Sequence, residues 1–145
     1  MLRILGCISV NGTKNNLEEF SLIARVMDAS ITQIGLKLKK PPMDYWIYSS
    51  PWYQFSHDML DDEIQDFVIE NSNFGIAVKK YHSELIYPLL TLCPTDMDED
   101  EDFSCLLSQK TIENISNIGV GLQISPALVM PISPFWNVKR NFSEH

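Results

Sequence analysis

The stretch SITQIGLKLKKPPMDYWIYSS, residues 30–50, holds two successive strand patterns separated by a pair of prolines. Residues 30–39 alternate apolar side chains with polar or basic ones, which is the two-residue period of a strand. Pro41 and Pro42 stop this strand because proline lacks the backbone N–H that a ladder needs. Residues 44–50 are rich in aromatic and β-branched side chains, which favour strands. The stretch therefore predicts two strands that pair antiparallel across a proline turn.

The residues before this pair predict a strand followed by a helix. Residues 2–10 form an apolar strand pattern that ends at Asn11-Gly12, a turn pair that tolerates positive φ. Asn16 is predicted to cap the next helix through its side chain, with Glu19 completing an approximate capping box. Helical spacing predicts a buried face for this helix that contains Leu17, Phe20, Ile23, Ala24 and Met27.

The residues after the pair predict two helices and a strand. A helix begins near Asp58, and Asn71-Ser72-Asn73 is predicted to interrupt it before a second, short helix. Helical spacing predicts two buried stripes, which are Leu60, Ile64, Phe67 and Val68, and then Phe74, Ala77, Val78 and Tyr81. Residues 85–93 form a continuous apolar strand pattern, in which Pro88 indicates a sheet edge or a bulge.

The C-terminal third predicts one more helix, a last strand and a tail. Ser108 is predicted to cap a helix over residues 109–118, and Gly119 stands where a glycine commonly ends a helix. The buried stripe of this helix is predicted to contain Leu107, Ile112, Ile115 and Ile118. Residues 120–130 alternate like a strand, and the proline-containing residues 131–145 predict an extended tail.

The order of these elements predicts an α+β fold. We expect a mixed, mainly antiparallel sheet with helices packed on one side, in a ferredoxin-like arrangement or a variant of it. A chain of 145 residues has the usual length of one domain, so residues 1–145 are predicted to form a single domain with 131–145 as its tail. No apolar segment approaches the roughly 20 residues that cross a bilayer, so no membrane partner is expected.

Charge is distributed unevenly along the chain. The net charge is −8, and residues 58–102 hold 13 acidic residues against Lys79 and Lys80, a local balance of −11. Such a segment repels nucleic-acid phosphates and attracts basic surfaces. The three cysteines lie far apart and are odd in number, which predicts reduced thiols in a cytoplasmic protein.

No catalytic or metal-binding pattern stands out. His57 adjoins Asp58, but no second histidine lies at helical spacing, which favours a solvated helix start over a metal site. The acidic run 96–102 lacks the glycine and the final glutamate of a calcium loop. No serine lies in a nucleophile elbow and no cysteine has a histidine nearby. The sequence therefore predicts a binding protein without a cofactor rather than an enzyme.

Several segments carry a resemblance to a known family. They are Leu2–Gly6, Leu17–Phe20, Asp44–Trp46, Ile64–Val68 and Phe103–Ile124. On these packing and capping patterns, residues from about 2 to 130 resemble the bacterial domain-of-unknown-function 4279 family. The resemblance implies a small immunity protein of a polymorphic toxin or contact-dependent growth inhibition system. Its partner would be a cognate toxin domain, expected to be a basic nuclease.

The predicted partner-binding residues combine charge with aromatic anchors. Electrostatic attraction is assigned to Asp58, Asp61, Asp62, Glu63, Asp66, Asp96, Asp98, Glu99, Asp100, Glu101 and Asp102. Trp52 and Tyr53 are predicted to lie in a loop and to serve as exposed anchors, because exposed aromatic residues commonly carry interface energy. The run 96–102 has a second interpretation as a solvated loop without a partner.

A small-ligand sensor is the alternative function. It predicts a pocket lined by Tyr45, Trp46 and the lysines at positions 37, 39 and 40.

Overall fold

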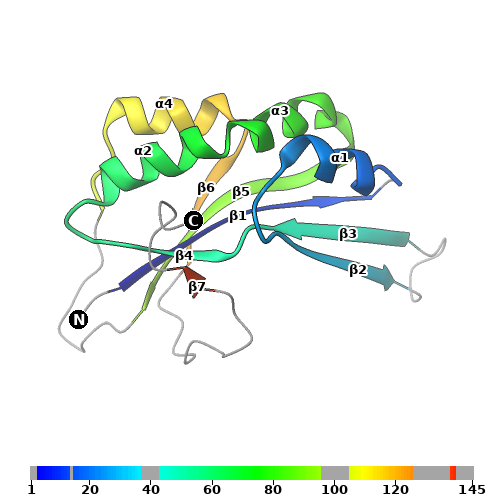
Figure 1. Ribbon diagram of the computed structural model, residues 1–145, viewed down its shortest axis with the longest axis horizontal. Helices are drawn as coiled ribbons and strands as arrows, with labels where there is room; N and C mark the ends of the chain where they lie inside the picture. Colours follow the sequence, from blue (N-terminus) through cyan, green and yellow to red (C-terminus); the bar gives the residue numbers. More distant parts are fainter. Residues whose placement is uncertain (1–2, 14, 37–42, 96–104, 126–137, 140–145) are drawn as a thin grey trace.

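A mixed β-sheet carries four helices on one of its faces (Figure 1). The computed structural model describes residues 3–13, 15–36, 43–95, 105–125 and 138–139. The elements in chain order are β1 Arg3–Gly12, α1 Leu17–Ala24, β2 Ser30–Leu36, β3 Met43–Ser49, β4 Trp52–Phe55, α2 Leu60–Glu70, α3 Ser72–Lys80, a short 3-10 helix His82–Glu84, β5 Leu85–Thr95, α4 Gln109–Asn117, β6 Gly121–Ile124 and β7 Val138–Lys139.

Strand β1 lies in the middle of the sheet. It pairs antiparallel with β3 and β4 on one side and with β5 on the other, and β2 pairs antiparallel with β3. The order β2-β3-β1-β5, with a helix crossing after β1 and two helices before β5, is that of a ferredoxin-like βαββαβ unit. Helix α4 and strand β6, which runs parallel to β5, extend this unit. The predicted α+β class is confirmed.

Strands β3 and β4 are two halves of one bent strand that follows β1 along its length. Between them, the Ser50 N–H donates to the Ile8 carbonyl at 2.9 Å, and the Ile8 N–H donates to Ser50 Oγ at 3.0 Å. Pro51 has no N–H to offer, so the regular ladder stops there. Trp52 and Tyr53 were expected in a loop, and this expectation is wrong because both lie in β4, which pairs with Gly6 and its neighbours in β1.

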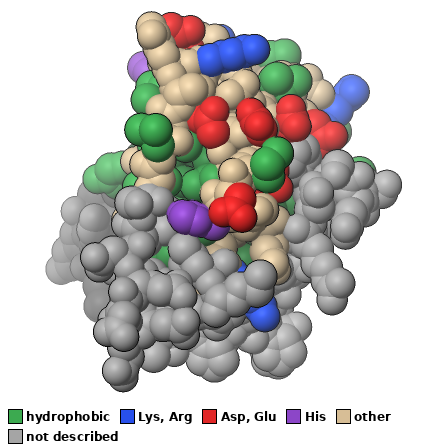
Figure 2. Space-filling view, turned by 90° about the vertical axis from the view of Figure 1, so that its left-hand side faces the viewer, with side chains coloured by type: hydrophobic (Ala, Val, Ile, Leu, Met, Phe, Trp, Pro, Cys, Tyr) green, Lys and Arg blue, Asp and Glu red, His purple; other side chains and the backbone are tan. Residues whose placement is uncertain are grey.

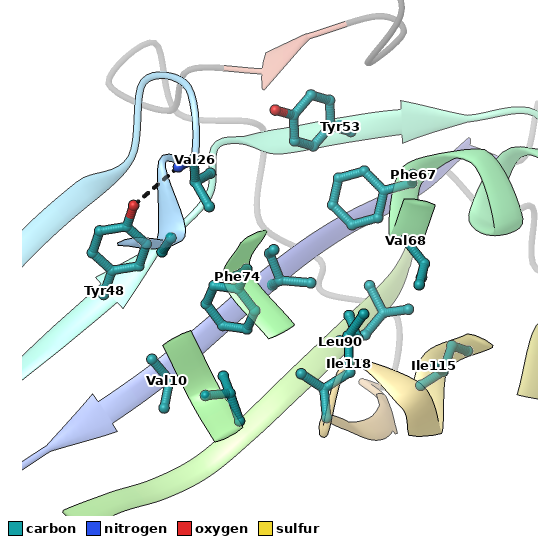
Figure 3. Packing of buried hydrophobic residues seen from close by; sticks show 14 of the residues in the cluster. Val10, Val26, Tyr48, Tyr53, Phe67, Val68, Phe74, Leu90, Ile115 and Ile118 are labelled. Carbon is teal, nitrogen blue, oxygen red and sulfur yellow. Dashed lines mark hydrogen bonds between the residues drawn. The ribbon is translucent and has the colours of Figure 1, made fainter. Parts of the chain in front are cut away.

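The core is an aromatic layer between the sheet and the helices. The ring of Phe20 lies 5.4 Å from Trp46, 5.3 Å from Tyr48 and 5.8 Å from Phe74, measured between centroids. Figure 3 shows side chains from β1, β5 and the helices converging there, with the Val26 N–H donating to the Tyr48 hydroxyl at 3.2 Å. The side chains of β3 alternate between the two faces of the sheet, since Trp46 and Tyr48 are buried while Tyr45 and Ile47 lie on the opposite face.

The start and the end of α1 both differ from the prediction. Asn16 precedes the helix, but its side chain makes no capping hydrogen bond and instead donates from Nδ2 to Glu84 at 2.6 Å. Glu19 likewise accepts from the Tyr81 hydroxyl at 2.7 Å instead of completing a capping box. The helix ends at Ala24 because Arg25 adopts a left-handed conformation, which leaves Met27 exposed rather than in the buried face.

The predicted helix break and strand irregularity are confirmed. Helix α2 ends at Glu70 and α3 begins at Ser72, with Asn71 between them. In β5 the register slips by one residue between Leu89 and Ile86, so that Tyr87 and Pro88 together face Val10. Tyr87 has a φ of 51°. Together the register slip and this φ identify a β-bulge, as Pro88 indicated.

Helix α4 begins at the predicted residue and ends one residue earlier than predicted, and its buried stripe differs by one residue. Ser108 Oγ accepts from the Thr111 N–H at 3.2 Å, and Gly119 follows the helix with a φ of 75°. Thr111, Ile115 and Ile118 are buried, whereas Ile112 is exposed. Thr111 takes the inward position because its hydroxyl finds polar partners there, at Ser108 Oγ and the Asp61 carbonyl. In β6, Leu122 and Ile124 are exposed.

Candidate partner-binding surface

The acidic residues of α2 divide into two groups that face different environments. Leu60, Ile64, Phe67 and Val68 turn toward the core, as predicted. Asp62 and Asp66 lie four residues apart on the opposite, exposed side of the helix, and Asp58 is exposed in the turn that precedes it. Figure 2 shows carboxylate side chains gathered across the end of the molecule at which α2 begins. We call Asp58, Asp62 and Asp66 the acidic crest.

Asp61 is not part of the crest, because it binds the start of α4. Its Oδ1 accepts from the Ser108 N–H at 2.7 Å, and its Oδ2 accepts from Gln65 Nε2 at 3.1 Å. The hydrogen bond from the Ser108 backbone lowers the pKa of this carboxyl group, and bonds to the side chains around it act in the same direction. Asp61 therefore helps to hold two helices together, and its predicted role in partner binding stays a prediction.

Glu63 is also engaged within the chain. Its Oε2 accepts from the Ser56 N–H at 2.9 Å, which ties the turn between β4 and α2 to the first turn of the helix. A carboxylate in the first turn is also favoured by the helix dipole. Glu63 contributes its charge to this end of the molecule, while its position is fixed by the turn.

The predicted aromatic anchors do not lie in an exposed loop. Tyr53 is only 2% exposed, and its ring lies 5.0 Å from that of Phe67 and points into the core. Burial is the main cause that raises the pKa of its hydroxyl to about 12. Trp52, its neighbour in β4, is half-buried on the other face of the sheet. Tyr53 is thus corrected from an anchor to a core residue, because the strand pairing decides where it points.

The remaining predicted site residues, Asp96, Asp98, Glu99, Asp100, Glu101 and Asp102, lie outside the described residues. Residues 41–78 contain neither lysine nor arginine, so the crest lies in a segment without basic residues. Lys79 and Lys80 come only at the end of α3. The crest thus carries only acidic charge along this segment, and its interactions with exposed charges are screened beyond about one Debye length, roughly 8 Å, at physiological salt.

A polar cluster that the sequence did not predict joins α1 to the chain that follows α3. It consists of the Asn16–Glu84 and Tyr81–Glu19 hydrogen bonds. The bond to Glu19 is the largest cause that raises the pKa of the Tyr81 hydroxyl to about 12. The partners are 68 and 62 residues apart, so no local pattern could have revealed this cluster.

The three cysteines, which were predicted to be reduced thiols, differ in burial. Cys7, Cys93 and Cys105 are all free, and the first two are buried. Burial raises the pKa of the Cys7 thiol to about 11, which keeps it protonated and unreactive at neutral pH.

The part of the chain that the structure describes contains no cluster of metal-binding side chains and no helix that could span a membrane. No group of three or more His, Cys, Asp or Glu side chains lies close enough there to hold a metal ion. None of the helices described there is long and apolar enough to span a membrane.

Comparisons with family models, with curated proteins and with solved structures gave no match for this chain. The resemblance to the bacterial domain-of-unknown-function family therefore stays a prediction.

Proposed function

We propose that this chain is an immunity protein that binds a cationic toxin domain through the acidic crest and neutralises it. The observation that carries the proposal is the exposure of Asp58, Asp62 and Asp66 on one side of α2, within a segment that holds no lysine or arginine. The resemblance described above supplies the toxin as the class of partner. Binding takes place in the cytoplasm, and the chain itself makes or breaks no bond.

Charge of one sign speeds the encounter with a partner of the opposite sign more than it strengthens the final complex. Tight binding of a partner at the crest therefore requires apolar contacts beside it. Ile69 supplies one, because it lies three residues after Asp66 and seven after Asp62, on the same side of α2, and it is 61% exposed. In this proposal Ile69 takes the anchoring role that Tyr53 is too buried to fill.

A small-ligand sensor gains no comparable support. Trp46, one wall of the pocket expected for it, packs against Phe20 in the core. The three lysines of that pocket lie outside the described residues.

The test is a kinetic binding measurement with the toxin-like domain encoded next to this chain. Asp62→Lys with Asp66→Lys reverses two crest charges, and the same charge change at Glu18 and Glu113, exposed on α1 and α4, is the matched control. In about 50 mM salt the crest variant should lose about tenfold or more in association rate, and the control less than about twofold. The loss should shrink in about 500 mM salt.

Two outcomes would contradict the proposal. If the wild-type chain does not bind this domain, the immunity role is wrong. If the crest and control variants slow association equally, the partner responds only to net charge, and the acidic crest is not the binding surface. Ile69→Ala separates the anchor from the charges, since it should speed dissociation and leave the association rate nearly unchanged.

A further inference from the structure

A row of exposed residues runs along α2 and continues onto α3. Its members follow one another at intervals of three, four, three, four and three residues, and they are Met59, Asp62, Asp66, Ile69, Asn73 and Ile76. The apolar members Met59 and Ile76 are 52% and 57% exposed, close to the value for Ile69. Two residues of the acidic crest, Asp62 and Asp66, lie between Met59 and Ile69. We call this row the outer stripe.

The outer stripe faces one way although the helix is interrupted at Asn71. Helices α2 and α3 follow each other in the layer that covers one face of the sheet (Figure 1). Each helix buries a side of its own, made of Leu60, Ile64, Phe67 and Val68 in α2 and of Phe74, Gly75, Ala77 and Val78 in α3. The stripe lies opposite these buried residues in both helices, so it continues across the break on the side that points away from the sheet.

The spacing of the stripe is the spacing at which one helix contacts another. Residues that alternate at intervals of three and four stay on one side of a helix and form the seam along which helices pack. Helical peptides recognised by proteins use the same intervals for their anchoring residues. From Met59 to Ile76 the stripe extends over about 25 Å, at about 1.5 Å per residue, which is long enough for a partner helix of several turns.

We propose that the outer stripe binds a basic amphipathic helix of the toxin domain, which lies along α2 and α3. The inference rests on the proposed function and specifies which part of the partner the acidic crest meets. Lysine or arginine side chains of that helix pair with Asp62 and Asp66, and its apolar side chains cover Met59, Ile69 and Ile76. The carboxylates speed the encounter, and the apolar contacts slow dissociation.

The charges of the stripe favour this partner over a second copy of the chain. Asp62 and Asp66 are four residues apart, so a matching helix needs two cations on one of its sides. None of the four α-helices that the structure describes provides them. Helices α1 and α2 contain no basic residue, and α4 contains one lysine. Lys79 and Lys80 of α3 are adjacent, so they point about 100° apart around the helix.

The first test measures how fast the toxin-like domain encoded next to this chain dissociates from variants of the stripe. Met59→Ala and Ile76→Ala leave every charge in place, and each should speed dissociation about fivefold or more. The matched control is Ile31→Ala, because Ile31 lies on the edge strand β2 with 48% exposure. It should change the dissociation rate by less than about twofold. All three positions are exposed, so the circular dichroism spectra should match that of the wild type.

The outcomes separate this inference from the proposed function. Suppose that Met59→Ala and Ile76→Ala dissociate no faster than the control, while Asp62→Lys with Asp66→Lys still slows association. The crest then binds the toxin domain, but the outer stripe is not the site of a helix, and the inference is wrong. A wild-type chain that does not bind the domain overturns both.

The second test reports the shape of the bound segment. The photo-cross-linker p-benzoylphenylalanine replaces Met59 in one variant and Ile69 in another, at points about 15 Å apart along α2. On a partner helix, the two cross-linked residues should lie about ten positions apart in one segment, whereas on an extended strand they would lie about four or five apart. The same cross-linker at Gln33, exposed on β2, is the control and should give no cross-link. Cross-links at strand spacing, in two separate segments, or between two copies of this chain overturn the proposal.

Discussion

Adjacent carboxylates on one helix perform different tasks in this protein. Asp61 accepts a short hydrogen bond from the N–H of Ser108, the N-cap residue of α4, whereas Asp62, the next residue, is exposed. A rotation of about 100° per residue places one at the contact between helices and the other outside. Formal charge counts both equally, but the carboxylate of Asp61 is held by a hydrogen bond to the start of another helix.

Asp61→Asn tests the structural role of this carboxylate. The asparagine keeps an acceptor but loses the charge, so the free energy of unfolding at pH 7 should fall by about 1 kcal/mol. The folded-state pKa of Asp61 is lowered, so its contribution is complete above the unfolded value near 4 and is lost as the pH falls through the folded value. Urea denaturation of both proteins at pH 7 and near pH 3 should show the difference shrinking in acid.

Asp62→Asn is the control for that measurement, because Asp62 is an exposed neighbour on the same helix. Its effect should stay within about 0.5 kcal/mol at either pH. An Asp61→Asn effect of the same size at both pH values would mean that the charge of Asp61 does not stabilise the junction of α2 and α4.

At the scale of elements, the bend between β3 and β4 decides where the aromatic side chains of this region point. Ser50 replaces the missing part of the ladder with its side chain, which accepts from the Ile8 N–H and donates to the Pro51 carbonyl at 2.9 Å. The strand can therefore turn at Pro51 and still pair with β1 on both sides of the bend. This continuity places Tyr53 and Phe55 in the core.

Ser50→Ala should destabilise the protein by about 1–3 kcal/mol, because the buried Ile8 N–H then has no acceptor. The measurement is urea denaturation, together with amide hydrogen exchange at Ile8, which should become faster. Ser49→Ala, one residue earlier and half-buried on the other face of the sheet, is the control and should change stability by less than about 0.5 kcal/mol. Equal effects of the two substitutions would show that the Ser50 hydroxyl does not support the bend.

At the scale of the whole molecule, the excess of negative charge acts on stability as well as on binding. The chain carries a net charge of −8, and α2 contributes five carboxylates without a basic residue. Repulsion among like charges destabilises a compact state. The same charges that would attract a cationic partner therefore weaken the unbound fold.

Added sodium chloride should raise the free energy of unfolding of the wild-type chain. Between about 10 mM and 500 mM salt, the Debye length falls from roughly 30 Å to under 5 Å, which screens the repulsion along α2. Urea denaturation across this range should show a smaller gain for Asp62→Asn with Asp66→Asn than for the wild type. A stability that falls with salt would mean that attractive ion pairs outweigh this repulsion.

Local sequence determined those features that depend on a few neighbouring residues. The Ser108 cap, the glycine after α4, the break at Asn71 and the bulge at Pro88 all agree with the structure, and the helix periods agree except at Met27 and Ile112. Each depends on backbone groups or side chains within about four positions, which a sequence displays directly. The α+β class followed because element order restricts the possible layers.

Only the tertiary structure decided which of the predicted site residues face solvent. Tyr53 is in the core because β4 pairs with β1. Asp61 accepts a hydrogen bond from Ser108, 47 residues away in sequence, because α4 lies beside α2. The Asn16 side chain binds the carboxylate of Glu84, 68 residues away in sequence, instead of capping α1. Contacts over such separations depend on the packing of the whole chain, so local patterns supply candidates for a surface and the fold selects among them.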